Sequence, residues 1–148
     1  MDIVKELSNE KELTAFAETI GSKLKGGEVI ELVSDLGGGK TTFTKGLVAG
    51  AYIKANVTSP SFNIKNEYRG EKFTSYHYDF YRLNEPGIMA SELAEATEDK
   101  NAVVIVEWSD IVKNVLPSQR LTITITVTGE NSRKLNIKYP KSYSYLLN

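Results

Sequence analysis

The stretch VIELVSDLGGGKTT, residues 29–42, decides the fold. Its first five residues are apolar apart from one glutamate and are typical of a buried strand, and three consecutive glycines precede a Lys-Thr-Thr segment. Glycines let several backbone N–H groups converge on a phosphate, because they adopt positive-φ conformations and carry no side chain. A helix that begins directly after such a loop points its N-terminal dipole at the bound anion. The stretch therefore predicts a strand, a phosphate-binding loop and a helix that runs to about Gly50.

The residue types of this loop predict how a nucleotide is held. The residues expected to contact the nucleotide are consecutive: Gly37, Gly38, Gly39, Lys40, Thr41 and Thr42. Lys40 is expected to reach the β and γ phosphates, and Thr41 to present its hydroxyl to Mg²⁺. The usual pattern, G-x-x-x-x-G-K-[ST], has glycine where this chain has Ser34, so Ser34 has to adopt a compatible backbone conformation.

The residues before this stretch predict an amphipathic helix. Its apolar positions recur at helical spacing and are Leu13, Phe16, Ala17, Ile20 and Leu24. Asn9 followed by Glu12 has the form of a capping box at the start of this helix, and Gly26-Gly27 is expected to end it.

The residues after the stretch predict four further strands and a fifth that is central. Residues 62–68 and 73–81 are expected to form a hairpin, and 121–127 with 134–139 a second one that closes the domain. Residues 102–106 are continuously apolar, as expected of a strand buried on both sides. We therefore expect an α/β fold, a three-layer P-loop NTPase-like domain with a mixed central β-sheet, helices on both faces and antiparallel hairpins.

The composition is that of an ordinary globular protein, with 148 residues, 41% of them hydrophobic and 25% charged, which predicts one domain over residues 1–148. The absence of cysteine excludes thiol catalysis, thiolate zinc sites and iron–sulfur clusters. The formal net charge of −1 argues against a module that binds duplex nucleic acid by itself. No apolar stretch is long enough to span a membrane and no signal peptide is visible, so we expect a cytoplasmic protein.

Two acids are candidates for the chemistry. Glu107 directly follows the apolar run 102–106, and a strand parallel to 29–33 delivers this carboxylate to the edge of the sheet where the glycine loop lies. It is expected either to bind Mg²⁺ or to position the attacking water. Strand alternation places His77, Asp79 and Tyr81 on one face, so Asp79 is a candidate second carboxylate for Mg²⁺.

Three neighbouring residues have less specific interpretations. The lone His77 is expected to be an ordinary, half-buried strand residue rather than a catalyst. Trp108 is either a packing residue or a contact for nucleotide or partner. Arg82 either stabilises phosphate charge or forms a surface ion pair.

Together these segments resemble a known family. In order and spacing the chain is similar to the TsaE family, the small bacterial ATPases of tRNA threonylcarbamoyladenosine biosynthesis. The resemblance covers about residues 16–138, and its most specific segments are TSPSF, HYDFYR and the Glu-Trp pair. The matching segments are SDLGGGKTTFTKGL, VTSPSFNIKNEY, YHYDFYRL, VVIVEWSD, LPSQRLTITI and finally Arg133.

The resemblance implies roles for particular residues. Thr41 and Glu107 would hold Mg²⁺, and Asp79 would be the additional acid needed for hydrolysis. Thr58 and Ser59 would lie in a switch-like loop, Trp108 beside the nucleotide site and Arg133 near the nucleotide.

The resemblance also implies an activity and partners. Family members hydrolyse ATP weakly alone, with Mg²⁺, and act with TsaD and TsaB, which transfer the threonylcarbamoyl group to the adenosine next to the anticodon. ATP turnover would then reset this complex, tRNA would be met through the complex, and no membrane would be involved.

Two other functions fit the same loop. A small-molecule P-loop kinase commonly needs a segment that carries arginines, and this chain has only four arginines. A binding module that uses nucleotide only to fix the shape of a partner surface has the same sequence signature as a slow ATPase. A GTPase is disfavoured because the chain has no N-K-x-D segment, which favours adenine over guanine.

Overall fold

The structure is a computed structural model that describes residues 1–35, 37–60 and 63–148. Leu36 of the glycine-rich loop, and Ser61 and Phe62 of the TSPSF segment, lie outside the described residues.

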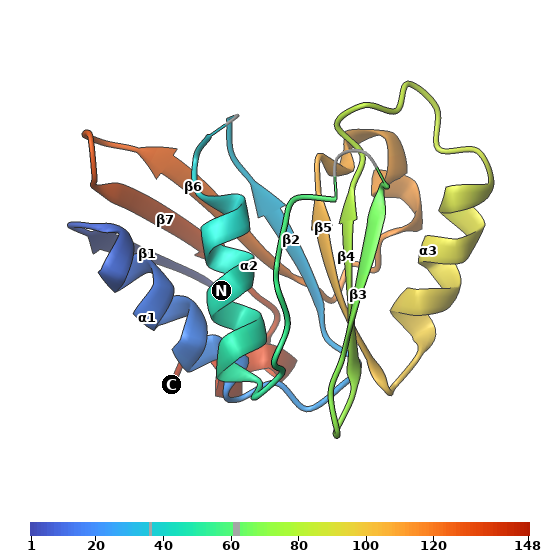
Figure 1. Cartoon of the computed structure of the whole chain (residues 1–148), viewed down its shortest axis with the longest axis horizontal. Helices are drawn as coiled ribbons and strands as arrows, with labels where there is room; N and C mark the ends of the chain where they lie inside the picture. The colour runs from blue at the N-terminus through green and yellow to red at the C-terminus, as the bar shows by residue number, and fades with distance from the viewer. Residues whose placement is uncertain (36, 61–62) are drawn as a thin grey trace.

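The described residues form a seven-stranded sheet with helices on both faces (Figure 1). The order of the strands across the sheet is β1-β7-β6-β2-β5-β4-β3. The strands are β1 (Asp2–Leu7), β2 (Val29–Val33), β3 (Lys65–Arg69), β4 (Thr74–Asp79), β5 (Ala102–Glu107), β6 (Leu121–Val127) and β7 (Arg133–Lys138).

The middle of the sheet is parallel and its two sides are antiparallel. β6, β2, β5 and β4 run parallel, while β3 pairs antiparallel with β4, and β7 pairs antiparallel with both β6 and β1. β5 lies between β2 and β4 and is buried along its whole length, which confirms the central strand predicted from its apolar run. The predicted mixed sheet with two hairpins is confirmed. The second hairpin does not form the edge, however, because β1 adds a further strand outside β7.

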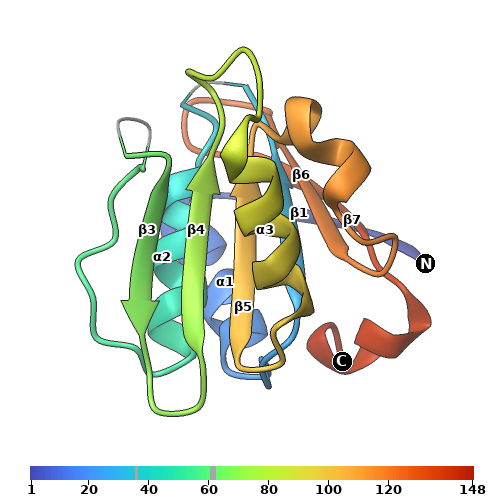
Figure 2. The same ribbon diagram turned by 90° about the vertical axis from the view of Figure 1, so that its right-hand side faces the viewer.

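Helices α1 (Glu10–Gly21) and α2 (Lys40–Gly50) cover one face of the sheet, and α3 (Ile88–Glu98) and the 3₁₀ helix η1 (Ser109–Val115) cover the other (Figure 2). The side chains of β5 alternate between these faces. Val103 and Ile105 pack toward α1 and α2, whereas Val104 and Val106 pack toward α3 and η1. The predicted three-layer arrangement follows from this division of the core.

The first helix has the predicted beginning and an earlier end than predicted. The Asn9 carboxamide accepts a hydrogen bond from the backbone N–H of Glu12 at 2.9 Å, as the capping box requires. α1 ends at Gly21 rather than at the Gly26-Gly27 pair, because the chain then tightens into turns. The buried Glu28 side chain fixes this connection by accepting from the backbone N–H groups of residues 25 and 26, both at 2.8 Å.

Other predicted boundaries shift by one to three residues. Of the residues described ahead of β3, 63 and 64 are not in the strand, which begins at Lys65, and β4 covers Thr74–Asp79 within the predicted 73–81. Four described elements have no counterpart in the expectations: β1, α3, η1 and the 3₁₀ helix η2 (Lys141–Leu146).

A buried glutamate ties three elements together on the η1 face of the sheet. Glu31 of β2 accepts hydrogen bonds from Ser109 at the start of η1, from Arg120 Nε at 3.0 Å and from Thr122 Oγ1 at 3.0 Å. Burial by itself raises the pKa of Glu31, but these three hydrogen bonds and the charge of Arg120 bring the pKa below its ordinary value. The ionised Glu31 carboxylate therefore accepts hydrogen bonds from η1 and from the residues at the start of β6.

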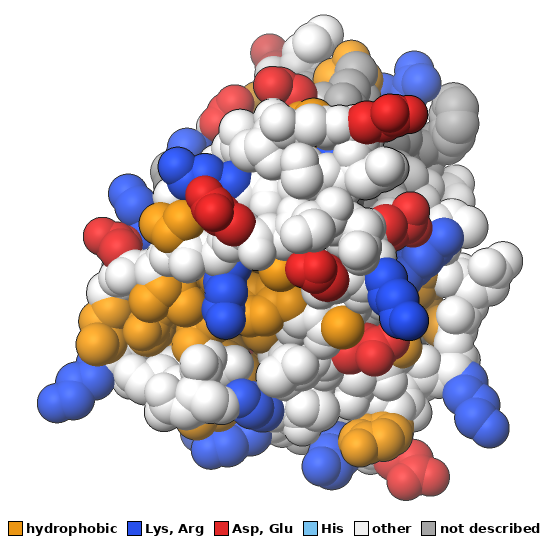
Figure 3. All heavy atoms as spheres, turned by 90° about the vertical axis from the view of Figure 1, so that its left-hand side faces the viewer, with side chains coloured by type: hydrophobic (Ala, Val, Ile, Leu, Met, Phe, Trp, Pro, Cys, Tyr) orange, Lys and Arg blue, Asp and Glu red, His pale blue; other side chains and the backbone are white. Residues whose placement is uncertain are grey.

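The C-terminal residues pack against the end of the sheet. Leu146 of η2 is buried, and Tyr145 donates a hydrogen bond from its hydroxyl to Glu28 Oε2 at 2.5 Å. Figure 3 shows the side of the molecule that lies on the left in Figure 1, where basic and acidic side chains are interspersed. Among the described residues, no helix is long and apolar enough to cross a membrane.

Candidate functional site

The glycine-rich loop joins β2 to α2 at the carboxyl end of the parallel strands. Gly37 and Gly39 have positive φ angles of 75° and 111°. Both therefore adopt the positive-φ conformation that was expected to require glycine in this loop. Gly39 immediately precedes α2, and its carbonyl accepts the first backbone hydrogen bond of the helix, from Phe43 at 2.8 Å. Ser34 is not among the described residues with positive φ, so a serine fits the backbone at this position.

The side chain of Lys40 lies folded against the loop. Its ammonium nitrogen donates to the carbonyl oxygen of Ser34 at 3.2 Å, to the Ser34 hydroxyl at 3.1 Å and to the carbonyl oxygen of Asp35 at 3.2 Å. The same nitrogen lies 4.5 Å from the ring centroid of Trp108, a cation–π distance. Lys40 is buried, so three oxygens and one aromatic face replace water around its charge.

Burial lowers the pKa of Lys40, because desolvation disfavours the ammonium form. The carboxylates of Glu107, Asp79 and Asp35 act in the opposite direction, since each favours a positive charge nearby. The loop thus holds the Lys40 ammonium among three carboxylates. The ammonium suits a polyanion, and the carboxylates suit a divalent cation bound with it.

Two carboxylates face this loop from adjacent parallel strands. Asp79 ends β4 and Glu107 ends β5, and the two residues are directly opposite each other in the register of the sheet. Both side chains are buried. Asp79 Oδ1 accepts from the backbone N–H of Tyr81 at 2.9 Å, and Oδ2 accepts from the Ser59 hydroxyl at 3.3 Å. The expected parallel pairing of β5 with β2 is present and brings Glu107 to the loop, while Asp79, which was a candidate from strand alternation, reaches it through the pairing of β4 with β5.

His77 differs from its expected environment, because it is completely buried rather than half-buried. Its Nε2 atom forms a short contact with Glu107 Oε2. His77 pairs in the register with Ile105, so Glu107 lies two residues further along the neighbouring strand, on the same face. His77 Nδ1 has no hydrogen-bond partner among the described residues. The histidine thus fixes the orientation of the Glu107 carboxylate.

A cavity of about 320 Å³ brings together the predicted site residues of the loop, the two acids and the tryptophan. The side chains and backbone that line it are Gly37, Gly38, Gly39, Lys40, Thr41, Thr42, Ser59, Asp79, Glu107 and Trp108.

Arg133 lies in a neighbouring cavity of about 260 Å³, which also contains Glu10 of α1 and Asn131, and which shares Gly37, Gly39 and Thr42 with the first cavity. Arg133 Nε donates to the carbonyl oxygen of Gly38 at 3.0 Å, so β7 braces the loop from behind.

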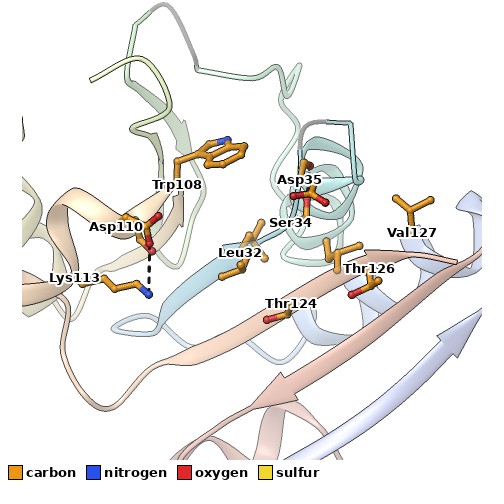
Figure 4. A pocket seen from close by; sticks show the side chains of 12 residues that line it. Leu32, Ser34, Asp35, Trp108, Asp110, Lys113, Thr124, Thr126 and Val127 are labelled. Atoms are coloured by element: carbon orange, nitrogen blue, oxygen red, sulfur yellow. Dashed lines mark hydrogen bonds and ion pairs between the residues drawn. The ribbon is translucent and has the colours of Figure 1, made fainter. Parts of the chain in front are cut away.

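The tryptophan separates the loop cavity from a second cleft. Trp108 has φ 54° and ψ 54°, a left-handed conformation that is uncommon for a bulky residue, and its ring lies 4.8 Å from that of Tyr81. Beyond it, a cleft of about 390 Å³ lies between the ends of β2 and β6 and the start of η1. Figure 4 shows Trp108 and Asp35 on opposite sides of this cleft, with Leu32 and Thr124 between them.

Two other residues considered in the sequence analysis, Thr58 and Arg82, do not line the cavity. Thr58 is exposed, and its carbonyl oxygen accepts from the Tyr68 hydroxyl at 3.3 Å, so only Ser59 of the switch-like pair lines the cavity. Arg82 is exposed and is not among the lining residues.

The donors in the loop cavity fit Mg²⁺, which is commonly bound by one or two carboxylates, substrate phosphates and several waters. Thr41, Asp79 and Glu107 supply one hydroxyl and two carboxylates. In the part of the chain that the structure describes, no group of three or more His, Cys, Asp or Glu side chains could hold a metal ion by itself. A cation here would therefore depend on phosphate oxygens for part of its coordination.

Comparison with known proteins gives a consistent result. The profile of the family described as "Threonylcarbamoyl adenosine biosynthesis protein TsaE" matches residues 7–135. A protein of that name from Rickettsia felis is 33% identical over 142 residues, which are 95% of this chain and 82% of that protein. The Bacillus subtilis protein of the same name is 36% identical over 131 residues, 86% of this chain and 79% of that one. The fold is similar to a crystal structure of Bacillus subtilis YdiB, with a TM-score of 0.80 and 31% identity over 99% of this chain and 92% of that chain.

Proposed function

The chain belongs to the TsaE family, and from that membership we propose that it binds and hydrolyses ATP as a subunit of the system that makes threonylcarbamoyladenosine in tRNA. One observation carries the ATPase part of this proposal. A single cavity contains a glycine-rich loop, the lysine at the start of α2 and two buried carboxylates from adjacent parallel strands.

The triphosphate lies along the loop in this proposal. The backbone N–H groups of residues 37–42 bind phosphate oxygens, and Lys40 contacts the β and γ phosphates after exchanging a loop oxygen for a phosphate oxygen. The nucleoside end extends toward the cavity beside Glu10 and Arg133, because that cavity shares loop residues with the first one.

Mg²⁺, held by Thr41 and Glu107, would neutralise charge on the phosphates when bound. His77 keeps the Glu107 carboxylate in one orientation, since the two side chains are buried together. Asp79, held by Ser59 and the backbone of Tyr81, assists by ordering the metal's surroundings or the attacking water. The protein contributes chiefly by positioning these groups.

We propose TsaD and TsaB as the partners, with tRNA met through their complex in the cytoplasm. The described lining of the loop cavity includes no arginine, and phosphoryl transfer is commonly accelerated by an arginine supplied by a partner. Weak turnover by the isolated chain, stimulated by partners, follows from such an incomplete site.

The test is ATP hydrolysis by the isolated protein and by its mixture with TsaD and TsaB. We expect partners to stimulate turnover, and Lys40→Ala, Asp79→Asn and Glu107→Gln each to reduce it about 100-fold, as for loss of a transition-state contact. Ser142→Ala, on the exposed surface of η2, is the matched control and should leave turnover unchanged.

Two results would contradict the proposal. Turnover that stays at the level of Lys40→Ala in every mixture, with ATP bound normally, would instead indicate a nucleotide-dependent binding module. ATP consumption that requires an added small-molecule acceptor would indicate a kinase.

A further inference from the structure

Ser34 and Gly38 occupy complementary space in the loop. A Cβ atom built on Gly38 would lie 2.3 Å from the Ser34 hydroxyl and 2.8 Å from the Ser34 Cβ. Gly37 and Gly39 have positive φ angles, but Gly38 does not. The backbone conformation at position 38 is therefore one that residues with a side chain adopt without strain. What excludes a side chain at position 38 is therefore chiefly the serine at position 34.

The same serine uses the donors of the nucleotide-binding lysine. A lysine ammonium has three N–H donors. Around Lys40 there are three oxygen acceptors, two of which belong to Ser34: its carbonyl at 3.2 Å and its hydroxyl at 3.1 Å. The hydroxyl donates in turn to the carbonyl oxygen of Asp35 at 2.8 Å, which fixes its rotamer.

We propose that Ser34 is a positioning residue for Lys40, and that Ser34 and Gly38 are a coupled pair in which the serine fills the space left by the glycine. Its consequence for ATP rests on the proposed function. Since all three donors of Lys40 have partners within the loop, one must be released before the ammonium contacts phosphate. The Ser34 hydroxyl is the acceptor that a side-chain substitution removes, so Ser34→Ala should bind ATP three- to tenfold more tightly.

The first experiment needs no nucleotide. Trp108 is the only tryptophan in the chain, and the Lys40 ammonium lies over its ring, so its fluorescence reports the position of that charge. We expect Ser34→Ala to change the Trp108 emission in the wild-type background and to leave it unchanged in a Lys40→Met background. The same change in both backgrounds would overturn the positioning role, because it would not depend on the lysine.

The second experiment measures the coupling by thermal unfolding. Gly38→Ala should lower the Tm of the otherwise wild-type protein by about 5 °C or more, as expected for overpacking. The decrease in Tm caused by Gly38→Ala should be smaller in the Ser34→Ala background, which lacks the hydroxyl nearest to the new Cβ. It should be smallest in the Ser34→Gly background, which also lacks the Ser34 Cβ. The matched control is Gly129→Ala, whose loss should be unaffected by Ser34→Gly because residue 129 is in the β6–β7 turn. Additive effects of positions 34 and 38 would overturn the coupled pair.

ATP binding to these variants separates this inference from the proposed function. If the wild-type protein binds no ATP, the proposed function fails, while the fluorescence and unfolding results still decide the roles of Ser34 and Gly38. If the wild type binds ATP and Ser34→Ala binds it equally or more weakly, competition between the hydroxyl and phosphate is refuted.

Discussion

Replacing Glu31 with glutamine should destabilise the protein strongly at neutral pH. The Glu31 carboxylate accepts from Ser109, Arg120 and Thr122, and glutamine keeps the shape while removing the charge and one acceptor oxygen. Hydrogen bonds to a charged group contribute about 1.5–3 kcal/mol each, and breaking a buried ion pair costs about 3–5 kcal/mol. Because Arg120 retains some contact with solvent, the ion pair is only partly buried, and we expect Glu31→Gln to lower the free energy of unfolding by about 3 kcal/mol. With a urea m-value of about 2 kcal/mol per M, the midpoint falls by about 1.5 M.

The loss should depend on pH with a defined sign. The pKa of Glu31 in the folded protein lies below its ordinary value of 4.5. The carboxylate therefore contributes stability that is fully present above that ordinary value and is lost as the pH falls through the folded pKa. The difference in unfolding free energy between wild type and Glu31→Gln should shrink steadily below about pH 5.

Urea unfolding at a series of pH values from neutral to acid measures this difference directly. Glu6→Gln is the matched control, because Glu6 is exposed on β1 and should change stability by less than about 0.5 kcal/mol at every pH. A Glu31→Gln protein within about 0.5 kcal/mol of wild type at neutral pH would refute the reasoning. So would a large loss that is the same at every pH.

Three further predictions concern other parts of the chain. Gly39→Ala should lower the free energy of unfolding in urea by about 1–2 kcal/mol and weaken ATP binding, because φ is 111° and the new Cβ would lie 3.1 Å from Leu13. An unchanged Tm and an unchanged affinity for ATP would contradict this. Leu146→Ala should cost about 2–4 kcal/mol in urea unfolding, since the side chain is buried, whereas an unpacked C-terminus would show no loss. Burial raises the pKa of Tyr78 to about 12, so Tyr78→Phe should remove one late-ionising tyrosine from an absorbance titration. Because the folded pKa is raised, Tyr78 contributes stability that declines above about pH 10, and Tyr78→Phe should flatten that decline.

The sequence predicted the centre of the molecule better than its margins. β2, the loop, α2 and β5 were predictable because a continuous apolar run, three glycines and a Lys-Thr pair each restrict the local structure strongly. β1 was missed because it is an edge strand with mostly exposed side chains, so it lacks a buried face that sequence periodicity could reveal. α3 was missed for a similar reason, since Leu93 is its one buried residue and no side chain caps its N-terminus.

The site shows the same division between local and long-range information. The loop residues and Glu107 were identifiable because they come at the end of recognisable apolar strands, and Asp79 because of the alternation within its own predicted strand. The contact of His77 with Glu107 depends on the register between β4 and β5, which local residue types do not encode. Parallel pairing of these two strands, once assumed, would have placed the two side chains diagonally on one face. Glu31 was hidden in an apolar run because its partners come from distant segments of the chain.

The pairing of β1 with β7 has a consequence for how the protein is made. β1 pairs, residue for residue, with β7, which is synthesised much later, as Asp2 opposite Lys138 shows. Closing so long a segment is entropically costly, and such distant pairings form slowly. Arg133, which supports the carbonyl of Gly38, belongs to that late strand. A nascent chain that has completed α2 and even β5 therefore still lacks the support of its phosphate loop, so nucleotide binding becomes available only after β7 has been synthesised and has joined the sheet.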